Sequence, residues 1–156
     1  MAATAKHDET PMGRAFAEAK AAGSGGEVPV GAVLVRDGAV VAIAGNRVEA
    51  ERDPTAHAEM LVLRAAAARL GRRQLDDCDL YVTLEPCPMC AAAIGFARIR
   101  RLYFAASDPK GGGVEHGARF FSQPTCHHAP EVYRGIRAGE AGELLSEFFR
   151  SRRVES

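Results

Sequence analysis

The chain has 156 residues, the size of one domain, and its 20 Lys and Arg residues balance its 20 Asp and Glu residues. This zero net charge excludes an overall electrostatic attraction to nucleic acid or to an anionic membrane, so a charged partner must bind a local patch. No run approaches the ~20 apolar residues of a membrane span and the N-terminus has no apolar signal segment, so we expect a cytoplasmic protein with no membrane partner.

We expect residues 1–10 to be disordered and residues 11–156 to form a single domain of four helices and five strands. In chain order, the expected elements are a helix at 11–22, strands at 28–35 and 39–45, a helix at 56–69, a strand at 79–84, a helix at 88–97, a strand at 98–106, an edge strand at 131–136 and a helix at 141–153. The strongest local signal is the Asp37-Gly38 turn between the first two strands. Thr55 is suited to cap the second helix.

The order of these elements predicts the fold class. A strand, a helix and a parallel strand with short connections form a right-handed crossover, and this unit repeats once. We therefore expect an α/β fold with a mixed sheet covered by helices. The stretch 107–130 is expected to be a long loop with one turn of helix at "ARFF", and loops of this length are often functional.

Four cysteines are too few for a disulfide scaffold, and in a reducing compartment we expect free thiols. Two of them form a C-x-x-C pair, Cys87 and Cys90, which indicates metal binding or redox exchange, with ordinary buried thiols as the simpler alternative. Pro88 opens a helix between them, so both cysteines lie at its first turn. The helix dipole favours thiolates there.

A histidine and a glutamate stand two apart in "TAHAEM", in the first turn of the second helix: His57 and Glu59. The N-termini of the second and third helices can meet at one edge of a mixed sheet, where α/β proteins usually place their sites. One imidazole and two thiolates suit zinc, and three protein ligands leave a fourth position open for water, which is the catalytic arrangement. Glu59 is poorly suited to be a ligand and well placed to move a proton of that water.

Two other chemistries remain open from these residues. A structural zinc would need a fourth protein ligand and would leave no position for water. The candidates for that ligand are Cys78, Cys126, His127 and His128. A thioredoxin-like exchange site at "CPMC" would leave His57 and Glu59 unexplained. The complete pattern, H-x-E followed by P-C-x-x-C, is the known signature of zinc nucleobase deaminases.

Four segments carry a closer resemblance: "EVPVGAVLV", "DPTAHAE", "LYVTLEPCPMCAAAI" and "LLSEFFRSRR". Across about residues 11–153 the chain resembles the bacterial tRNA adenosine deaminases of the cytidine deaminase superfamily. The core motifs are shared by deaminases of many substrates, whereas "FFRSRR" and "DPK" are more particular to the tRNA branch. The resemblance implies a three-layer α/β/α cytidine deaminase-like fold with a mixed five-stranded sheet. It also implies hydrolysis of the wobble adenosine to inosine, chiefly in an arginine tRNA, by a homodimer with one Zn²⁺ per subunit that binds the anticodon stem-loop near the subunit interface.

The resemblance also implies roles for particular residues. His57, Cys87 and Cys90 would hold the zinc, and Glu59 would protonate the ring nitrogen as hydroxide attacks and then supply a proton to the departing ammonia. Asn46 matches an asparagine that contacts the target nucleotide. The other residues expected to line the pocket or bind the RNA are Pro29, Val30, Ala58, Asp108, Lys110, Phe149, Arg152 and Arg153.

Local basic patches must supply any contact with RNA. Those we identify are Arg98, Arg100 and Arg101 in one segment, and Arg150, Arg152 and Arg153 in another. A basic helix end is also an ordinary solvated terminus. Two departures from the family pattern stand out: Gly45 replaces a frequent Trp, and the segment 111–130 has its own sequence, "GGGVEHGARFFSQPTCHHAP". We expect this segment to shape a variant RNA-binding loop; the alternative is a narrower pocket for a free base or nucleotide. The residues concerned are Arg119, Phe120, Phe121, His127 and His128.

Three functions therefore remain in order of preference. The first is a zinc-dependent tRNA adenosine deaminase, and the second is a free nucleobase or nucleoside deaminase of the same fold, acting on guanine or cytosine. The third is a non-catalytic, zinc-stabilised RNA-binding module. An open zinc position and a requirement for Glu59 distinguish the first two from the third.

Overall fold

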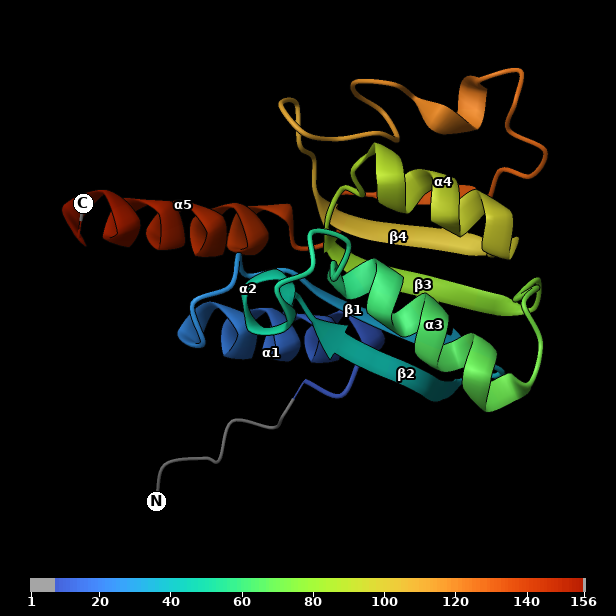
Figure 1. The fold of residues 1–156 in the computed structure, drawn as a ribbon, viewed down its shortest axis with the longest axis horizontal. Coiled ribbons are helices and arrows are strands. Elements are labelled where there is room, and N and C mark those ends of the chain that lie inside the picture. The colour runs from blue at the N-terminus through green and yellow to red at the C-terminus, as the bar shows by residue number, and fades with distance from the viewer. Residues whose placement is uncertain (1–7, 156) are drawn as a thin grey trace.

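The computed structural model describes residues 8–155, apart from the side chains of residues 153–155, and shows one sheet between two layers of helices (Figure 1). The elements are α1 Pro11–Ser24, β1 Gly31–Arg36, β2 Ala39–Gly45, α2 Val48–Glu51, α3 Ala58–Leu70, β3 Cys78–Leu84, α4 Pro88–Ala97, β4 Arg101–Ala106, the 3₁₀ turn η1 Phe120–Ser122, β5 Glu131–Arg134 and α5 Ala138–Glu155. Residues 1–7 of the segment that the sequence predicts to be disordered lie outside this description. At the end of that segment, the hydroxyl of Thr10 accepts a hydrogen bond from Gly13 N and caps α1.

The sheet has five strands in the order β2-β1-β3-β4-β5. β1 is antiparallel to both of its neighbours, whereas β3, β4 and β5 are parallel to one another. The predicted mixed sheet and the edge position of β5 are therefore confirmed. Because β2 and β3 are each antiparallel to β1, they run in the same direction and their carboxyl ends lie at the same edge of the sheet.

Two apolar clusters fix the layers. On one face, α3 and α4 pack against side chains such as Leu80 and Val82 of β3 (Figure 1). On the other face, α1 and the beginning of α5 pack against Val33 and Val35 of β1. Successive side chains of β1 and β3 point to opposite faces of the sheet, and both faces are covered by helices. These central strands are therefore almost continuously apolar. The predicted three-layer α/β/α fold is confirmed.

Several boundaries differ from the predicted ones. The helix expected from residue 56 begins at Ala58 with His57 as its N-cap residue, so Thr55 lies too early in the chain to cap it. The Thr55 hydroxyl donates to Asp53 Oδ1 at 2.7 Å. α2 was not predicted because four residues are too few to show a helical period. The fourth strand begins at Arg101 instead of 98, because Arg98 adopts the left-handed conformation that ends α4. Within the described part of the chain, no helix combines the length and apolarity needed to cross a membrane.

The helix α1 lies close against β1 at Gly31. A Cβ atom built on Gly31 would lie 2.0 Å from the carbonyl oxygen of Ala15 and 2.7 Å from the amide nitrogen of Ala19. Both neighbours are backbone atoms of α1, so they cannot rotate away as a side chain would. Glycine at this position therefore sets the spacing between helix and sheet.

We predict that Gly31→Ala destabilises the protein by ~3 kcal/mol or more, because α1 must move away from the sheet. Urea unfolding followed by circular dichroism would measure the change. Gly142→Ala is the matched control, since nothing lies within 4 Å of its added Cβ and alanine favours the helix. It should leave stability unchanged or raise it by up to ~1 kcal/mol. Equal stability of the two variants would contradict this account.

Candidate active site

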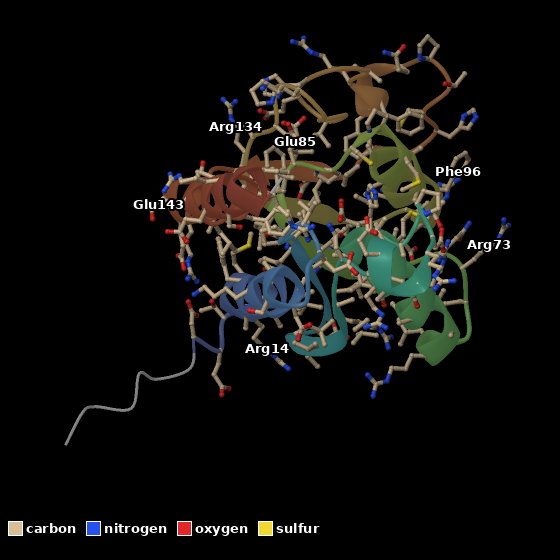
Figure 2. All side chains as sticks on the ribbon, turned by 60° about the vertical axis from the view of Figure 1, so that its left-hand side comes forward. Arg14, Arg73, Glu85, Phe96, Arg134 and Glu143 are labelled. Carbon is tan, nitrogen blue, oxygen red and sulfur yellow. The ribbon has the colours of Figure 1, made fainter. Side chains whose placement is uncertain are left out.

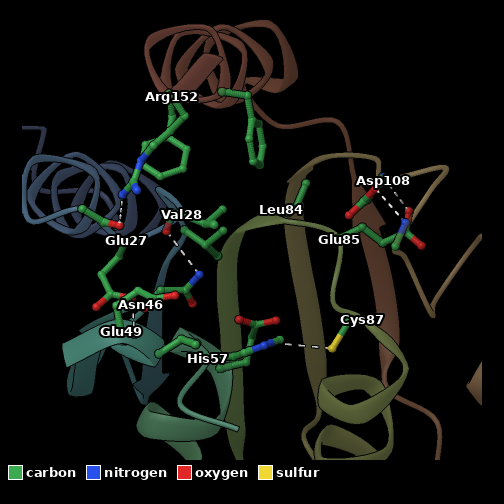
Figure 3. A pocket seen from close by; sticks show the side chains of 17 residues that line it. Glu27, Val28, Asn46, Glu49, His57, Leu84, Glu85, Cys87, Asp108 and Arg152 are labelled. Atoms are coloured by element: carbon green, nitrogen blue, oxygen red, sulfur yellow. Dashed lines mark hydrogen bonds between the residues drawn. The ribbon is translucent and has the colours of Figure 1, made fainter. Parts of the chain in front are cut away.

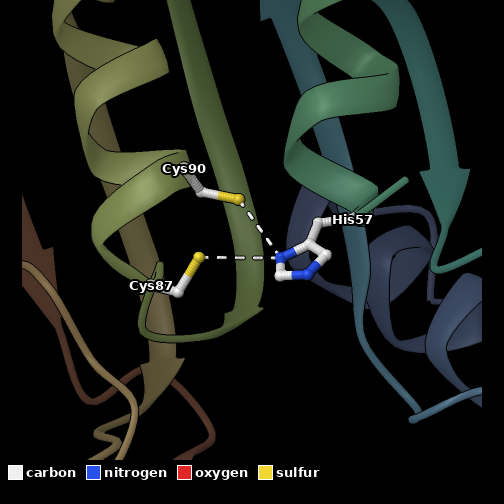
Figure 4. Close-up of side chains that lie close together, drawn as sticks. All are labelled: His57, Cys87 and Cys90. Atoms are coloured by element: carbon white, nitrogen blue, oxygen red, sulfur yellow. Dashed lines mark hydrogen bonds between the residues drawn. The ribbon is translucent and has the colours of Figure 1, made fainter. Parts of the chain in front are cut away.

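Two helix N-termini meet at the edge of the sheet where β2 and β3 end. His57 is the N-cap residue of α3 and Cys87 is the N-cap residue of α4, both with extended backbone, and Cys90 lies in the first turn of α4. Neither N-cap side chain makes a capping hydrogen bond to the backbone of its own helix. Both are free to point toward each other across the gap between the helices (Figure 4).

The distances among these three side chains suit a tetrahedral metal. His57 Nδ1 lies 3.6 Å from Cys87 Sγ and 3.4 Å from Cys90 Sγ. A tetrahedral zinc with bonds of ~2.3 Å to sulfur and ~2.0–2.1 Å to nitrogen places such atoms about 3.5 Å apart. The ligand atoms of all three residues lie within 4.8 Å of one another. The donor set and its spacing therefore fit zinc, with Nδ1 as the nitrogen that faces it.

The electrostatics of the two thiols differ. A hydrogen bond from Cys90 and the neighbouring His57 lower the pKa of Cys87 to about 4. The same hydrogen bond, together with burial, raises the pKa of Cys90. Cys87 thus supplies a thiolate, the form that binds metals, at the positive end of α4.

Glu59 follows His57 in the first turn of α3 and faces the same space. It is only 4% exposed, and burial raises the pKa of its carboxyl group. It is one of the residues that line the adjoining pocket. A buried carboxyl group beside a metal site and open to a ligand pocket is placed to exchange protons with what enters that pocket.

A closed site with four protein ligands is not formed. Cys78 lies at the opposite end of β3 from the zinc residues. The Cys126 thiol donates to the carbonyl of His128 at 3.2 Å, and the His128 ring pairs with the carbonyl of Ile99 at 2.9 Å. Among residues 8–152, where side chains are described, no group of three or more potential ligands other than His57, Cys87 and Cys90 comes together. The described residues therefore offer a zinc three protein ligands, which would leave its fourth position for water.

A pocket of about 600 Å³ opens beside these residues (Figure 3). His57 and Cys87 lie at one end of it, and side chains from α5 lie across the other (Figure 3). Its walls come from the segment before β1, from α2, from the ends of β2 and β3, from the loop after β4 and from α5. The lining residues are Gly26, Glu27, Val28, Val30, Asn46, Val48, Glu49, His57, Glu59, Leu84, Glu85, Cys87, Asp108, Gly111, Phe148, Phe149 and Arg152.

The pocket contains most, but not all, of the residues expected to line it. Those present are Val30, Asn46, Asp108, Phe149 and Arg152. Three expected residues do not line it: Pro29 is buried, Ala58 is buried in the first turn of α3, and Lys110 is exposed outside it. The side chain of Arg153 lies outside the described residues.

Asn46 has a structural role that the sequence does not predict: it links two separate segments of backbone. Its Oδ1 accepts a hydrogen bond from Ala58 N at 2.8 Å, and its Nδ2 donates to the carbonyl of Val28 at 3.2 Å. The side chain therefore joins the segment before β1 to the first turn of α3. It caps α3 in the place of Thr55 and holds the backbone beside His57. This bond also explains why the Ala58 amide is not open to the pocket.

Asp108 and Arg152 each stabilise a wall of the pocket. Asp108 Oδ1 accepts hydrogen bonds from the amides of Lys110 and Gly111, at 3.2 and 2.9 Å, which closes a turn after β4. Arg152 donates to the carbonyl of Gly26 and lies over the ring of Phe148, 4.8 Å from its centre. This contact ties the end of α5 to the turn after α1.

The basic patch at the start of β4 does not border the pocket. Arg100 makes two hydrogen bonds to Asp79, at 3.0 and 2.9 Å, and Arg101 bonds to Glu131 at 2.8 Å. These pairs lie at the amino end of β4, about 20 Å from the pocket edge at ~3.3 Å per residue. Acidic partners thus balance the charges of Arg100 and Arg101, whereas Arg98 is exposed beside a separate recess.

The segment 111–130 also lies largely outside the pocket. Only Gly111 lines it. Phe120 and Phe121 pack beside the cluster of α3 and α4, and η1 contacts α4. His127 and His128 border a separate recess of about 170 Å³ near the carboxyl end of α4. Residues 112–130 therefore do not line the pocket directly.

Two carboxylates near the pocket were missed by the sequence analysis. Glu27 accepts hydrogen bonds from the amides of Glu49 and Ala50, at 3.0 and 2.9 Å, and so holds α2 at the pocket. Glu85 is buried at the end of β3 and accepts several backbone hydrogen bonds from the loop after β4. Burial alone would raise the pKa of Glu85, but these donors and His116 hold it below its usual value. The only signal in the sequence was an acidic residue directly beside an apolar strand.

Comparisons with known proteins agree with this geometry. Residues 5–106 match the family described as the cytidine and deoxycytidylate deaminase zinc-binding region. The chain is 60% identical to the tRNA-specific adenosine deaminase of Agrobacterium fabrum over 92% of this chain and 95% of that protein. It is 46% identical to the tRNA-specific adenosine deaminase of Bacillus subtilis over 94% and 91%.

Solved structures give the same picture. One, from studies of A-to-I editing by tRNA:A34 deaminases at the wobble position of transfer RNA, has a TM-score of 0.85 and 61% identity, covering 86% of this chain and 98% of that one. The structure of a guanine deaminase from Bacillus subtilis has a TM-score of 0.64 and 36% identity, and covers 94% of both chains. The fold and the metal-binding motifs are thus shared with deaminases of different substrates.

We predict that Cys90→Ser lowers the zinc content from about one to less than ~0.1 per chain, because it removes one of only three protein ligands. Inductively coupled plasma mass spectrometry of the purified protein would measure this. Cys126→Ser is the control, and it should keep the full zinc content because Cys126 bonds to a backbone carbonyl elsewhere. If the control lost as much zinc, Cys126 would be a fourth ligand and the interpretation as a closed structural zinc site would be favoured.

Proposed function

This chain belongs to the tRNA-specific adenosine deaminases, within the zinc-binding cytidine and deoxycytidylate deaminase family, and from that membership we propose that it converts adenosine to inosine at the wobble position of a tRNA anticodon. Arginine tRNA is the substrate that the family resemblance implies. The observation that carries the proposal is the pocket in which Glu59 lies beside His57 and Cys87. The base would be flipped out of the RNA into this pocket, because its reacting carbon is inaccessible in a stacked loop.

The reaction replaces the amino group of adenine by oxygen: water and adenosine give inosine and ammonia. His57, Cys87 and Cys90 would hold the zinc, which when bound would supply a nucleophile near neutral pH by lowering the pKa of water. Glu59 would take one proton from the attacking water and deliver it to the ring nitrogen next to C6. It would then take the second proton from the hydroxyl group added at C6 and deliver it to the departing amino group, so that inosine and ammonia form. Its burial keeps bulk water from competing for those protons.

Other residues of the chain bind and orient the nucleotide. Asn46 keeps one amide hydrogen free after its bond to Val28, and this hydrogen is available to the substrate. Val30 supplies an apolar wall, and Phe149 of α5 is 45% exposed at the open side, where it suits stacking on a neighbouring base. Arg152 lines the pocket and is placed to contact the phosphate backbone of the RNA. It supplies a local positive charge in a chain whose net charge is zero.

The proposal extends to assembly and place in the cell. Strands from residues 31 to 134 join one sheet, which supports a single deaminase domain over residues 11–156. Phe96 projects from α4 and is 77% exposed (Figure 2), which supports a homodimer that covers it. Each subunit would hold one zinc. Because its substrate is tRNA, the enzyme would act in the cytoplasm.

Deamination of free guanine is the second candidate, because the solved guanine deaminase from Bacillus subtilis shares 36% of its sequence over most of both chains. The tRNA-specific relative from Agrobacterium fabrum is far more similar, at 60%. The tRNA:A34 deaminase structure also superimposes better, with a TM-score of 0.85 against 0.64. These differences favour the RNA substrate.

We predict that the protein forms inosine at the wobble position of an arginine-tRNA anticodon stem-loop and releases no ammonia from guanine, cytosine or cytidine. Glu59→Gln should lower the rate by more than ~10²-fold, because the amide cannot move protons, while the zinc content stays unchanged. Product analysis of the digested RNA by mass spectrometry would show both. Ammonia from a free base with an untouched stem-loop would move the function to nucleobase deamination, and full activity of Glu59→Gln would refute the mechanism.

A further inference from the structure

The loop that follows β4 is organised around a single buried carboxylate. Glu85 is 2% exposed and lies two residues before Cys87, at the carboxyl end of β3 (Figure 3). Its Oε1 accepts the amide of Asp108 at 3.0 Å, and its Oε2 accepts the amides of Val114 and Glu115 at 3.2 and 3.1 Å. One side chain therefore fixes both ends of a loop that leaves the sheet and returns to it.

His116 completes this arrangement and is its only side-chain donor among the described residues. Its Nδ1 lies 2.8 Å from Glu85 Oε1, and its own amide lies 3.2 Å from Oε2. Because the ionised carboxylate only accepts hydrogen bonds, the ring must donate through Nδ1. Hydrogen bonds to a charged group are stronger than neutral ones, so this bond contributes more than an ordinary loop contact.

The loop held in this way forms a wall of the pocket. Asp108 and Gly111 line the pocket: Asp108 is the first point at which Glu85 binds the loop, and Gly111 lies between it and the second point, at Val114. The backbone is packed tightly: a Cβ on Gly112 would lie 2.2 Å from Glu85 Oε2, and one on Gly113 would lie 2.5 Å from Pro88 N. The amide of Gly113 also donates to the carbonyl of Pro86 at 2.8 Å. The loop thus has little freedom to move relative to the residues around Cys87.

We propose that the hydrogen bond from His116 to Glu85 positions the loop 108–116 as a rigid wall for the substrate, so that His116 sets substrate affinity without touching the substrate. His116 belongs to the segment that departs from the family pattern, and its ring is one-third exposed and lies behind the wall. It acts through Glu85 on Asp108 and Gly111. It is a positioning residue, distinct from the zinc ligands and from Glu59. This inference rests on the proposed function for its kinetic test, but not for its structural test.

The test compares three single variants. His116→Leu removes the donor, whereas His116→Asn keeps a donating nitrogen at the place of Nδ1. Gln74→Leu is the control, since Gln74 is an exposed residue of the turn before β3 that neither belongs to the loop nor lines the pocket. For each variant, kcat and KM would be measured on the arginine-tRNA stem-loop, zinc content would be determined, and hydrogen exchange of the amides of 108–116 would be followed without RNA.

His116→Leu should raise KM about tenfold, the effect of losing one charge-assisted hydrogen bond, with kcat within about twofold of the wild-type value. Its amides at 108 and 114–116 should exchange at least about tenfold faster, while its zinc content stays the same. His116→Asn and Gln74→Leu should resemble the wild type. Unchanged exchange and KM in His116→Leu, equal effects in the control, or failure of His116→Asn to preserve the wild-type values would overturn the proposal. If the wild type does not deaminate the stem-loop, the proposed function fails, and hydrogen exchange still decides whether His116 positions the loop.

Discussion

The site depends on one topological constraint: β1 lies between β2 and β3 and is antiparallel to both. The two outer strands must then run in the same direction, and the helices that follow them must begin at the same edge of the sheet. Each helix presents its positive end and an extended N-cap residue there, so that His57 and Cys87 face each other. A zinc site with ligands from segments 30 residues apart follows from this arrangement without any unusual backbone.

The walls of the pocket use a second device, in which buried polar side chains hold short pieces of backbone. Asn46 fixes the first turn of α3, Glu27 fixes α2, and Glu85 fixes the loop after β4. Each side chain satisfies amides that have no partner in the sheet, so the irregular segments lose little by being buried. The sheet edge that carries the zinc ligands is thus common to the fold, whereas the hydrogen bonds of these three side chains determine the shape of the pocket beside it. This division explains how one fold serves deaminases of different substrates.

The chemistry of the site was predictable because it lies in short, regular segments. The helix at 88–97 was predicted without error, since Pro88 fixes its first residue, and the spacing of Cys87 and Cys90 followed from it. The start of α3 was predicted wrongly, because the side-chain oxygen that accepts the hydrogen bond of its first amide belongs to Asn46, twelve residues earlier in the chain. Glu85 was missed for the same reason: its partners lie 23 to 31 residues away, and no local pattern records them. Contacts between distant segments, more than local propensities, account for what the sequence did not reveal.

Zinc K-edge X-ray absorption of the purified protein tests the central claim most directly, because it counts the atoms around the metal. A site held by His57, Cys87 and Cys90 predicts two sulfur atoms at ~2.3 Å and two nitrogen or oxygen atoms at ~2.0–2.1 Å, one of them from the solvent. A third sulfur atom would show that another cysteine closes the site, and would contradict an active centre with a position open to water.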